Sequence, residues 1–198
     1  MALTKVQVIS SALLQLGHAP IVSLTDGDPL VQAAEAAFDL KLPSVLASGN
    51  WRFATQIQQL SLSVEPAPYP WKAIYLLPAG FLKMLRTFPN IYVWDIYNNE
   101  KIYTDFQSSW YMEYVYQPDV SHLPAHFVDY FVYEIAAYLA LSNAQSAPFF
   151  SVLEGKRVQM QAMAHAIETQ NRPQFSQVNF PVLNNRYIGG MIGNSIGF

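Results

Sequence analysis

The sequence predicts an α+β fold: an antiparallel four-helix bundle with an inserted small β-rich region and an extended C-terminal arm. Apolar residues recur at helical spacing in residues 1–53 and again in 121–170. They alternate with polar residues in 54–120, as in half-buried strands. Residues 171–198 follow neither pattern. We therefore expect N-terminal helices, a β-rich insertion, C-terminal helices and an arm at these boundaries, with the two helical parts packed together as one bundle.

The first helix is expected to end at Leu16, because glycine is common just past a helix end and Gly17 follows. An apolar repeat at helical spacing predicts its buried face. The residues of this repeat are Val6, Ile9, Leu13 and Leu16.

The second helix is expected to start at Asp28-Pro29, because the Asp side chain accepts from free N–H groups and proline fits the first helical position. Pro43 lies inside it and removes a backbone hydrogen bond, so we expect a kink or restart near Leu42. Gly49 is the expected end. The predicted apolar stripe is Leu30, Ala34, Phe38, Leu42 and Val45.

The β-rich region is predicted from short runs of aromatic and β-branched residues. A proline-rich turn at 65–70 follows the first run, and residues 97–100, Tyr-Asn-Asn-Glu, are expected to form a hairpin turn. The expected strands are residues 57–64, 73–77, 91–96, 101–104 and 111–116.

Aromatic residues are abundant in this region. They fit ordinary sheet packing and interfaces, which we favour, or a platform that binds sugars or stacks on bases. The residues are Tyr75, Tyr92, Trp94, Tyr103, Trp110, Tyr111, Tyr114 and Tyr116.

Two more helices are predicted at residues 127–142 and 148–169. The first is apolar on nearly every side, which indicates burial against several neighbours. The second carries one apolar stripe and a weak point at Gly155, which costs about 1 kcal/mol relative to alanine.

Residues 171–198 contain no acidic residue, two arginines, four glycines and many large apolar side chains. Such a segment is too hydrophobic for an ordinary disordered tail, and too rich in glycine and asparagine to fold alone. We expect an arm that orders on a partner, with a reach on the order of 90 Å when extended. The alternative is a segment that packs back on its own domain as an irregular covering strand.

Composition excludes several classes of protein. Charged residues make up only 13% of the chain and the net charge is −3, which suits apolar partner surfaces and argues against a general nucleic-acid binder. Without cysteine there are no disulfides and no thiolate chemistry. The N-terminus lacks the features of a signal peptide, and residues 127–141 are too short and polar to span a membrane. We expect a protein that is made and kept in the cytoplasm until it assembles.

No enzyme motif stands out, and we expect no catalytic activity, cofactor or metal. His122 and His126 are four apart, but Pro124 lies between them and a third ligand is lacking. Sugar hydrolysis needs two carboxyl groups that flank a cleft. The spacing selects no pair among the carboxylates of the aromatic region, which we expect to be solvated: Asp95, Glu100, Asp105 and Glu113.

Two motifs carry a resemblance to a known family. They are Leu16-Gly17-x-x-Pro20-x-x-Ser23-Leu24 and Gly49-Asn50-Trp51-x-Phe53. Together with residues 77–85, the paired late helices and the arm, they resemble the tail tubular protein A family, the head-to-tail connector (adaptor) proteins of short-tailed bacteriophages (podoviruses). Pro43 and the low charge depart from the family pattern.

The resemblance implies a structural virion protein that forms a ring of twelve subunits between the portal and the tail nozzle. Such a ring closes the packaged head and forms part of the DNA ejection channel. The implied partners are the portal protein, a tail tubular protein B-like nozzle, tail fibres, and genomic DNA in transient non-specific contact. The alternative is a peptidoglycan- or sugar-acting tail protein that uses the aromatic β region. We expect the arm to bind the portal through Arg172, Phe175, Phe180, Arg186, Tyr187, Ile188 and Phe198.

Overall fold

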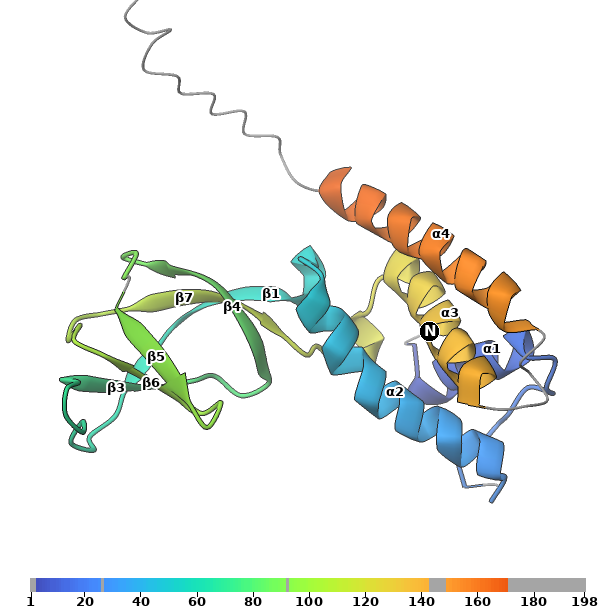
Figure 1. Ribbon diagram of the computed structural model, residues 1–198, viewed down its shortest axis with the longest axis horizontal. Coiled ribbons are helices and arrows are strands. Elements are labelled where there is room, and N and C mark those ends of the chain that lie inside the picture. Colours follow the sequence, from blue (N-terminus) through green and yellow to red (C-terminus); the bar gives the residue numbers. More distant parts are fainter. Residues whose placement is uncertain (1–2, 26, 92, 143–148, 171–198) are drawn as a thin grey trace, which may run out of the picture.

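A computed structural model shows two lobes, one of helices and one of strands (Figure 1). The helices are α1 (Lys5–Gln15), α2 (Pro29–Ser48), α3 (Ala125–Ser142) and α4 (Phe150–Gln170). Helix α3 is central, and each of the other three packs against it. The structure describes residues 3–25, 27–91, 93–142 and 149–170.

Helices α1 and α2 each begin at a side chain that caps free backbone N–H groups, and α1 is followed by a glycine. Thr4 and Gln7 form a capping box at the start of α1, and Gly17 follows the helix with φ of +81°. The Asp28 side chain accepts from the backbone N–H of Leu30 at 2.9 Å, which confirms the predicted start of α2.

Of the kink or restart predicted near Leu42, the restart is wrong. Helix α2 runs from Pro29 to Ser48 as one helix, with Pro43 inside it. Proline at this position leaves the carbonyl of Asp39 without its usual helical donor. Asp39 is exposed, so water can take the place of that donor.

The first of two antiparallel sheets, sheet A, has the strand order β1-β7-β4. Its strands are β1 (Thr55–Gln59), β7 (Tyr111–Tyr116) and β4 (Phe81–Phe88). A short 3₁₀ turn, η1 (Arg52–Ala54), leads from α2 into β1. A second such turn, η2 (Val120–His122), lies between β7 and α3.

The second sheet, sheet B, has the order β2-β3-β6-β5. Asn98 and Asn99 connect β5 to β6 with positive φ angles of 55° and 53°, the conformation of a type I′ hairpin turn. This confirms the predicted turn. The strands of sheet B are β2 (Ser61–Leu62), β3 (Ala73–Leu76), β6 (Lys101–Thr104) and β5 (Trp94–Tyr97).

Sheet A forms a wall between two hydrophobic cores. Val115 of β7 packs with the helices, as do Leu82 and Leu85 of β4. Tyr114 of β7, by contrast, belongs to the core of the β lobe, together with Met112. The two faces of one strand therefore belong to two cores, because successive side chains of a strand point in opposite directions.

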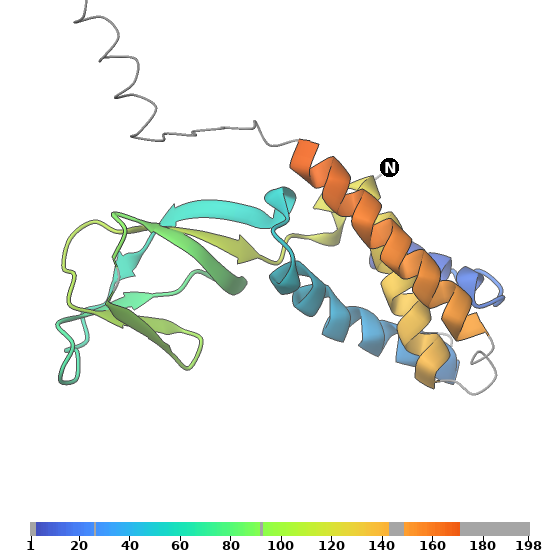
Figure 2. The ribbon, with the colours of Figure 1, turned by 45° about the horizontal axis from the view of Figure 1, so that its top comes forward.

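The prediction of a four-helix bundle with a small β insertion is wrong. The protein is an α+β fold of four helices and two antiparallel sheets, and the strands have a core of their own. Sheet A also supplies side chains to the helical core, so the strands are part of the main architecture. Figure 2 shows the ribbon of sheet A beside the helices. The arm predicted at residues 171–198 lies outside the described residues.

Candidate functional site

The candidate site is the junction of the two lobes, where the segment Gly49-Asn50-Trp51-Arg52-Phe53 leads from α2 to β1. Trp51 is only 1% exposed, and its indole N–H donates to the carbonyl of Val45 at 3.0 Å. Its ring stacks on His165 of α4, with centroids 4.4 Å apart, and meets the edge of Phe127 of α3 at 5.0 Å. One side chain thus ties three helices together at the junction.

Gly49 is required beside this ring for reasons of space. A Cβ atom at this position would lie 2.3 Å from Nε1 of Trp51, much closer than side-chain atoms can approach. The spacing of Gly49 and Trp51, noticed in the sequence, therefore has a steric cause.

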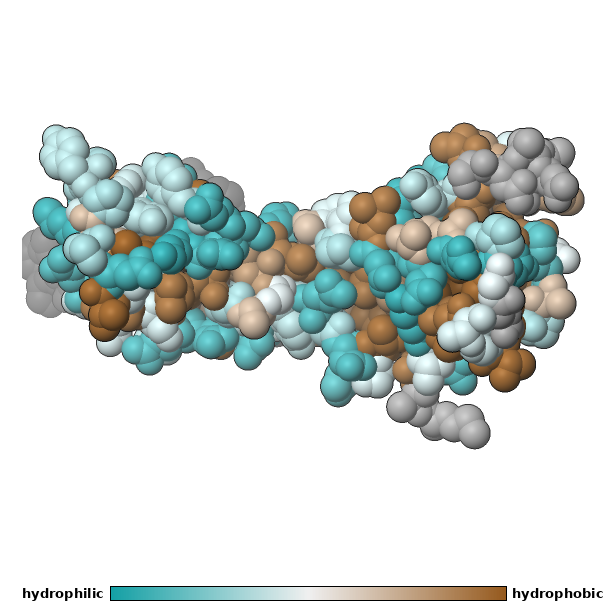
Figure 3. All heavy atoms as spheres, turned by 90° about the horizontal axis from the view of Figure 1, so that it is seen from below, coloured by the Kyte–Doolittle hydropathy of each residue, from teal (hydrophilic) through white to brown (hydrophobic). Residues whose placement is uncertain are grey.

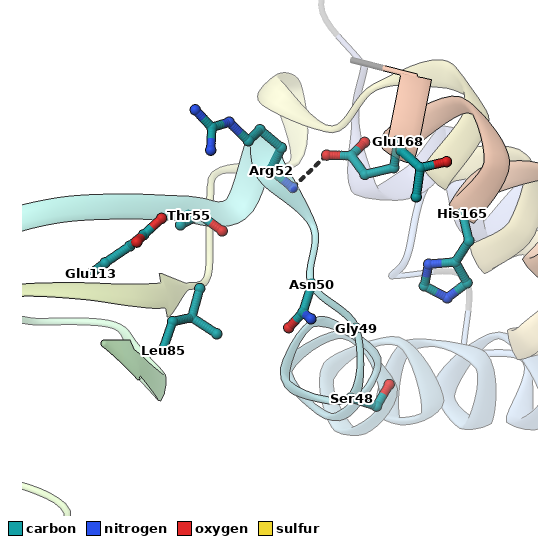
Figure 4. Close-up of a pocket in the computed structure, with 10 residues that line it drawn as sticks. Ser48, Gly49, Asn50, Arg52, Thr55, Leu85, Glu113, His165 and Glu168 are labelled. Atoms are coloured by element: carbon teal, nitrogen blue, oxygen red, sulfur yellow. Dashed lines mark hydrogen bonds between the residues drawn. The ribbon is translucent and has the colours of Figure 1, made fainter. Parts of the chain in front are cut away.

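Glu168 of α4 connects the C-terminal end of that helix to the junction. Its carboxylate is buried and accepts a hydrogen bond from the backbone N–H of Arg52 (Figure 4). It also lies 3.0 Å from Nε2 of His126 of α3. Nothing in the local sequence distinguished Glu168 from an ordinary exposed glutamate near a helix end.

A second buried carboxylate, Glu113 of β7, lies on the sheet side of the junction and pairs with Arg86 of β4. The expectation that Glu113 is solvated is wrong, because its side chain is almost fully buried. In contrast, Asp95, Glu100 and Asp105 are exposed.

A cleft of about 330 Å³ separates these two carboxylates (Figure 4). It lies where α2 ends, β1 begins and α4 ends. Its walls are Ser48, Gly49, Asn50, Arg52, Thr55, Leu85, Glu113, His165, Glu168 and Thr169. Both carboxylates accept hydrogen bonds inside the protein, Glu113 from the side chain of Arg86 and Glu168 from the backbone N–H of Arg52.

Burial also sets the protonation of a neighbouring phenol. Tyr130 of α3 packs beside Trp51, and its burial raises the pKa of the phenol to about 12. The nearby charge of Glu134 acts in the same direction.

The histidine pair does not form a metal site in the structure. His122 is exposed on η2, whereas His126 is engaged with Glu168. Across the ranges that the structure describes, no three histidine or acidic side chains gather where they could hold a metal ion.

The aromatic residues of the β lobe lie in different environments. Trp94 and Tyr111 are exposed, Tyr116 packs partly buried against the core, and Tyr92 lies outside the described residues. Tyr75, Trp110 and Tyr114 are buried and form its core. Another group lines a cleft of about 290 Å³ at the hairpin between β5 and β6. This cleft is lined by Pro68, Tyr69, Pro70, Trp71, Tyr97, Asn98 and Tyr103.

Helix α4 has an exposed apolar flank beside its buried face. Large hydrophobic residues are exposed on both lobes (Figure 3). On α4 and just before it, four of these residues lie on one side of the helix and form the α4 flank, whereas exposed Val158 lies on the opposite side. The residues of the flank are Phe149, Val152, Met163 and Ile167.

Comparisons with known proteins supply no family. The chain matches no protein-family model, and no curated protein matches its sequence. In the part of the chain that the structure describes, no helix combines the length and apolar content of a membrane span. All seven residues predicted to bind the portal fall in 171–198, outside the described residues.

Proposed function

We propose that this protein is a structural virion protein, a head-to-tail connector of a short-tailed bacteriophage. In this proposal, it forms a ring, of twelve subunits by resemblance, between the portal and a tail tubular protein B-like nozzle. It closes the packaged head, forms part of the DNA ejection channel and contacts DNA only in passing. Tail fibres are further candidate partners. Its location is the head-tail junction of the virion.

The observation that carries the proposal is the α4 flank. A folded monomer gains nothing from large apolar side chains in water, so several of them on one side of α4 favour contact with another protein surface. Low overall charge suits the repeated contacts of a ring, since interface cores are depleted in charged residues.

The two motifs of the family resemblance give further support. Leu16 and Leu24 of the first motif pack in or against the helical core, as Trp51 of the second does. Residues of both motifs therefore pack in or against the same core. In this proposal, that core fixes the shape with which the subunit assembles. The C-terminal segment that follows α4 is proposed to bind the portal.

The test is electron microscopy of the full-length protein mixed with its cognate portal ring. An added ring of density beneath the portal is the expected result. A portal that stays bare at saturating protein would overturn the proposal.

Variants separate the two proposed contacts. Met163→Lys with Ile167→Lys places charges on the α4 flank and should prevent ring formation, while Val22→Lys, at an exposed loop position, is the matched control. Phe175→Ser with Phe180→Ser should weaken attachment to the portal. Rings that form normally with both lysines on α4 would show that this flank is not the subunit contact.

Sugar binding is a second candidate function, favoured by the aromatic cleft at the β5–β6 hairpin. Tyr69 at its rim is 97% exposed, and a flat exposed ring can stack on the apolar face of a sugar. Isothermal titration with soluble peptidoglycan fragments tests this function. Binding that is abolished by Tyr69→Ala would favour it, and unchanged heats would reject it.

A further inference from the structure

The outer side of α2 is a helix face without a charged side chain. Its residues recur at intervals of three and four positions and lie opposite the buried side of the helix. Leu40, in the middle of this side, is 61% exposed. An uncharged apolar helix face in water favours contact with another protein surface. The residues of this α2 face are Pro29, Ala33, Ala36, Leu40, Pro43 and Ala47.

The α2 face and the α4 flank match in length and shape. Each spans about 27 Å, from Pro29 to Ala47 and from Phe149 to Ile167, because an α-helix rises about 1.5 Å per residue. The α4 flank carries large side chains, whereas alanine and proline predominate on the α2 face. The large side chains can therefore fit between the small ones when the two helices pack together.

The charges beside the two surfaces are of opposite sign. Lys156 is exposed on the side of α4 that carries the flank, and its ammonium donates to the neutral side chain of Gln159 at 3.5 Å. Asp39 borders the α2 face, and its side chain is 63% exposed. Lys5 lies 2.8 Å from Asp39 and 3.0 Å from Glu35, so one cation is shared by two carboxylates at this border. The excess negative charge there complements Lys156.

Within one molecule, the α4 flank points away from α2. His165 of α4 stacks on Trp51, which follows the end of α2. A residue two positions after Met163 lies on nearly the opposite side of an α-helix, so the flank and His165 face in opposite directions. Helices α2 and α4 also pack on different sides of α3 (Figures 1 and 2). The two surfaces can therefore meet only between copies of the chain.

We propose that the α4 flank of one copy packs on the α2 face of the next copy. The contact joins two different surfaces, so each copy keeps one of each for its other neighbour, and the assembly can close as a ring. This inference rests on the proposed connector ring and names the surface that receives the α4 flank.

The direction of the two helices follows from the ring. Helices α2 and α4 run in the same direction in Figures 1 and 2, and neighbouring subunits of a ring of twelve differ by a rotation of only about 30°. The packed helices are therefore nearly parallel. With Phe149 beside Pro29, Lys156 lies about 4.5 Å along the helix axis from Asp39, within reach of its long side chain.

Cysteine cross-linking in rings assembled on the cognate portal tests the contact. The chain contains no cysteine, so introduced thiols are the sole thiols. Full-length chains that carry both Ala33→Cys and Val152→Cys should form disulfide-linked multimers larger than dimers, because each copy has both surfaces. Val158→Cys in place of Val152→Cys is the matched control, since Val158 is exposed on the opposite side of α4, and should give no multimers.

The other outcomes of this experiment separate the contact from the proposed function. Rings that form on the portal but yield no multimers would overturn the contact and leave the connector function standing. Disulfide dimers of the Val152→Cys chain alone would mean that two α4 flanks face each other, which also overturns it. A portal on which the natural protein forms no ring would overturn both.

A charge exchange tests the same contact without cysteine. Lys156→Glu should raise the protein concentration needed for half-maximal ring formation about tenfold, because like charges then face each other. Adding Asp39→Lys should restore the natural value, whereas adding Asp95→Lys, at an exposed position of β5, should not. Circular dichroism of the variants checks that the fold is retained. No change with Lys156→Glu, or equal rescue by Asp95→Lys, would overturn the proposal.

Discussion

The two lobes differ in how their cores are built around one buried tryptophan each. Trp51 lies where three helices meet the sheet, and its neighbours come from distant parts of the chain. Trp110 lies inside the β lobe, where its ring meets Tyr75 at 5.2 Å and Phe106 at 6.2 Å. Its indole N–H donates to the carbonyl of Pro89 at 3.3 Å.

The helical core contains side chains from the sheet, whereas the buried side chains of the β core all come from the β lobe. We infer that packing of the helical core depends on the sheet more than packing of the β core depends on the helices. The helical core includes Val115 of β7, and partly buried residues of β4 pack against it. The buried residues of the β core all lie between Leu60 and Tyr114. Damage at Trp51 should therefore spread through both lobes, whereas damage at Trp110 should remain in one.

The largest effect is expected for Trp51→Ala. Loss of a fully buried tryptophan should lower the free energy of unfolding by about 3–5 kcal/mol. Urea unfolding followed by circular dichroism measures this loss, and hydrogen exchange should show reduced protection in both α3 and β7. Trp110→Ala is the matched variant, with protection lost in the β lobe and retained in α3. Equal loss of α3 protection in the two variants would mean that the cores unfold as one unit.

The next largest effect is a loss of stability at alkaline pH through ionisation of Tyr130. Burial raises the pKa of Tyr130 from 10 to about 12, so between these values the unfolded chain releases a proton that the folded chain retains. Stability is thus fully present below pH 10 and is lost as the pH rises toward 12, by about 2–3 kcal/mol. Urea unfolding of Tyr130→Phe at about pH 9 and about pH 12 should show a smaller loss than the natural protein.

The corresponding phenol of the β core provides the comparison. Burial also raises the pKa of Tyr114. If Tyr114→Phe removes more of the alkaline loss than Tyr130→Phe does, the β core sets the alkaline limit.

Glu168→Ala tests the connection between the lobes. It leaves the N–H of Arg52 without its acceptor, which should cost about 1–3 kcal/mol in the free energy of unfolding. Glu168→Gln keeps an acceptor oxygen and should cost less. Glu154→Ala, which removes a surface pair with Arg157 on the same helix, is the control at about 1 kcal/mol or less. Equal losses for the alanine variants would refute a special role of Glu168.

The smallest effect is expected at the start of α2. Asp28→Ala removes the cap of Leu30 N–H and should cost about 1 kcal/mol. Thermal unfolding measures the change, and Asp28→Asn, which caps equally well, should restore stability. The β lobe should keep its hydrogen-exchange protection in both variants. A loss there would show that the far end of α2 also supports the sheets.

Local chemistry was readable from the sequence where one or two residues determine a conformation. Asp28-Pro29 starts a helix, Gly17 ends one, and Asn98-Asn99 makes a hairpin turn. In each case the signal lies within a few residues of its effect.

The strand β4 was missed because its sequence resembles a helix. Phe-Leu-Lys-Met-Leu-Arg-Thr-Phe contains good helix formers, and its two register shifts break the alternation by which a strand is recognised. Its pairing with β7 involves residues far along the chain, which no local pattern reports. Without β4 the β region looked like a small insertion.

The junction was only partly predictable. Gly49 and Trp51 were noticed as a motif, whereas Glu168 and Glu113 resemble ordinary surface carboxylates in the sequence. Their burial depends on partners far away, Arg52 for Glu168 and Arg86 for Glu113. Long-range pairing of this kind leaves no periodic signal in a single sequence.

The position of β7 between the cores has a mechanical consequence. Tyr114 and Val115 are adjacent in the chain, yet one packs with the strands and the other with the helices. A slip of one residue would exchange the two and disrupt both cores at once, so the strand cannot slide. Since β7 leads through η2 into α3, tension applied to the tip of the β lobe passes along this strand directly to the central helix.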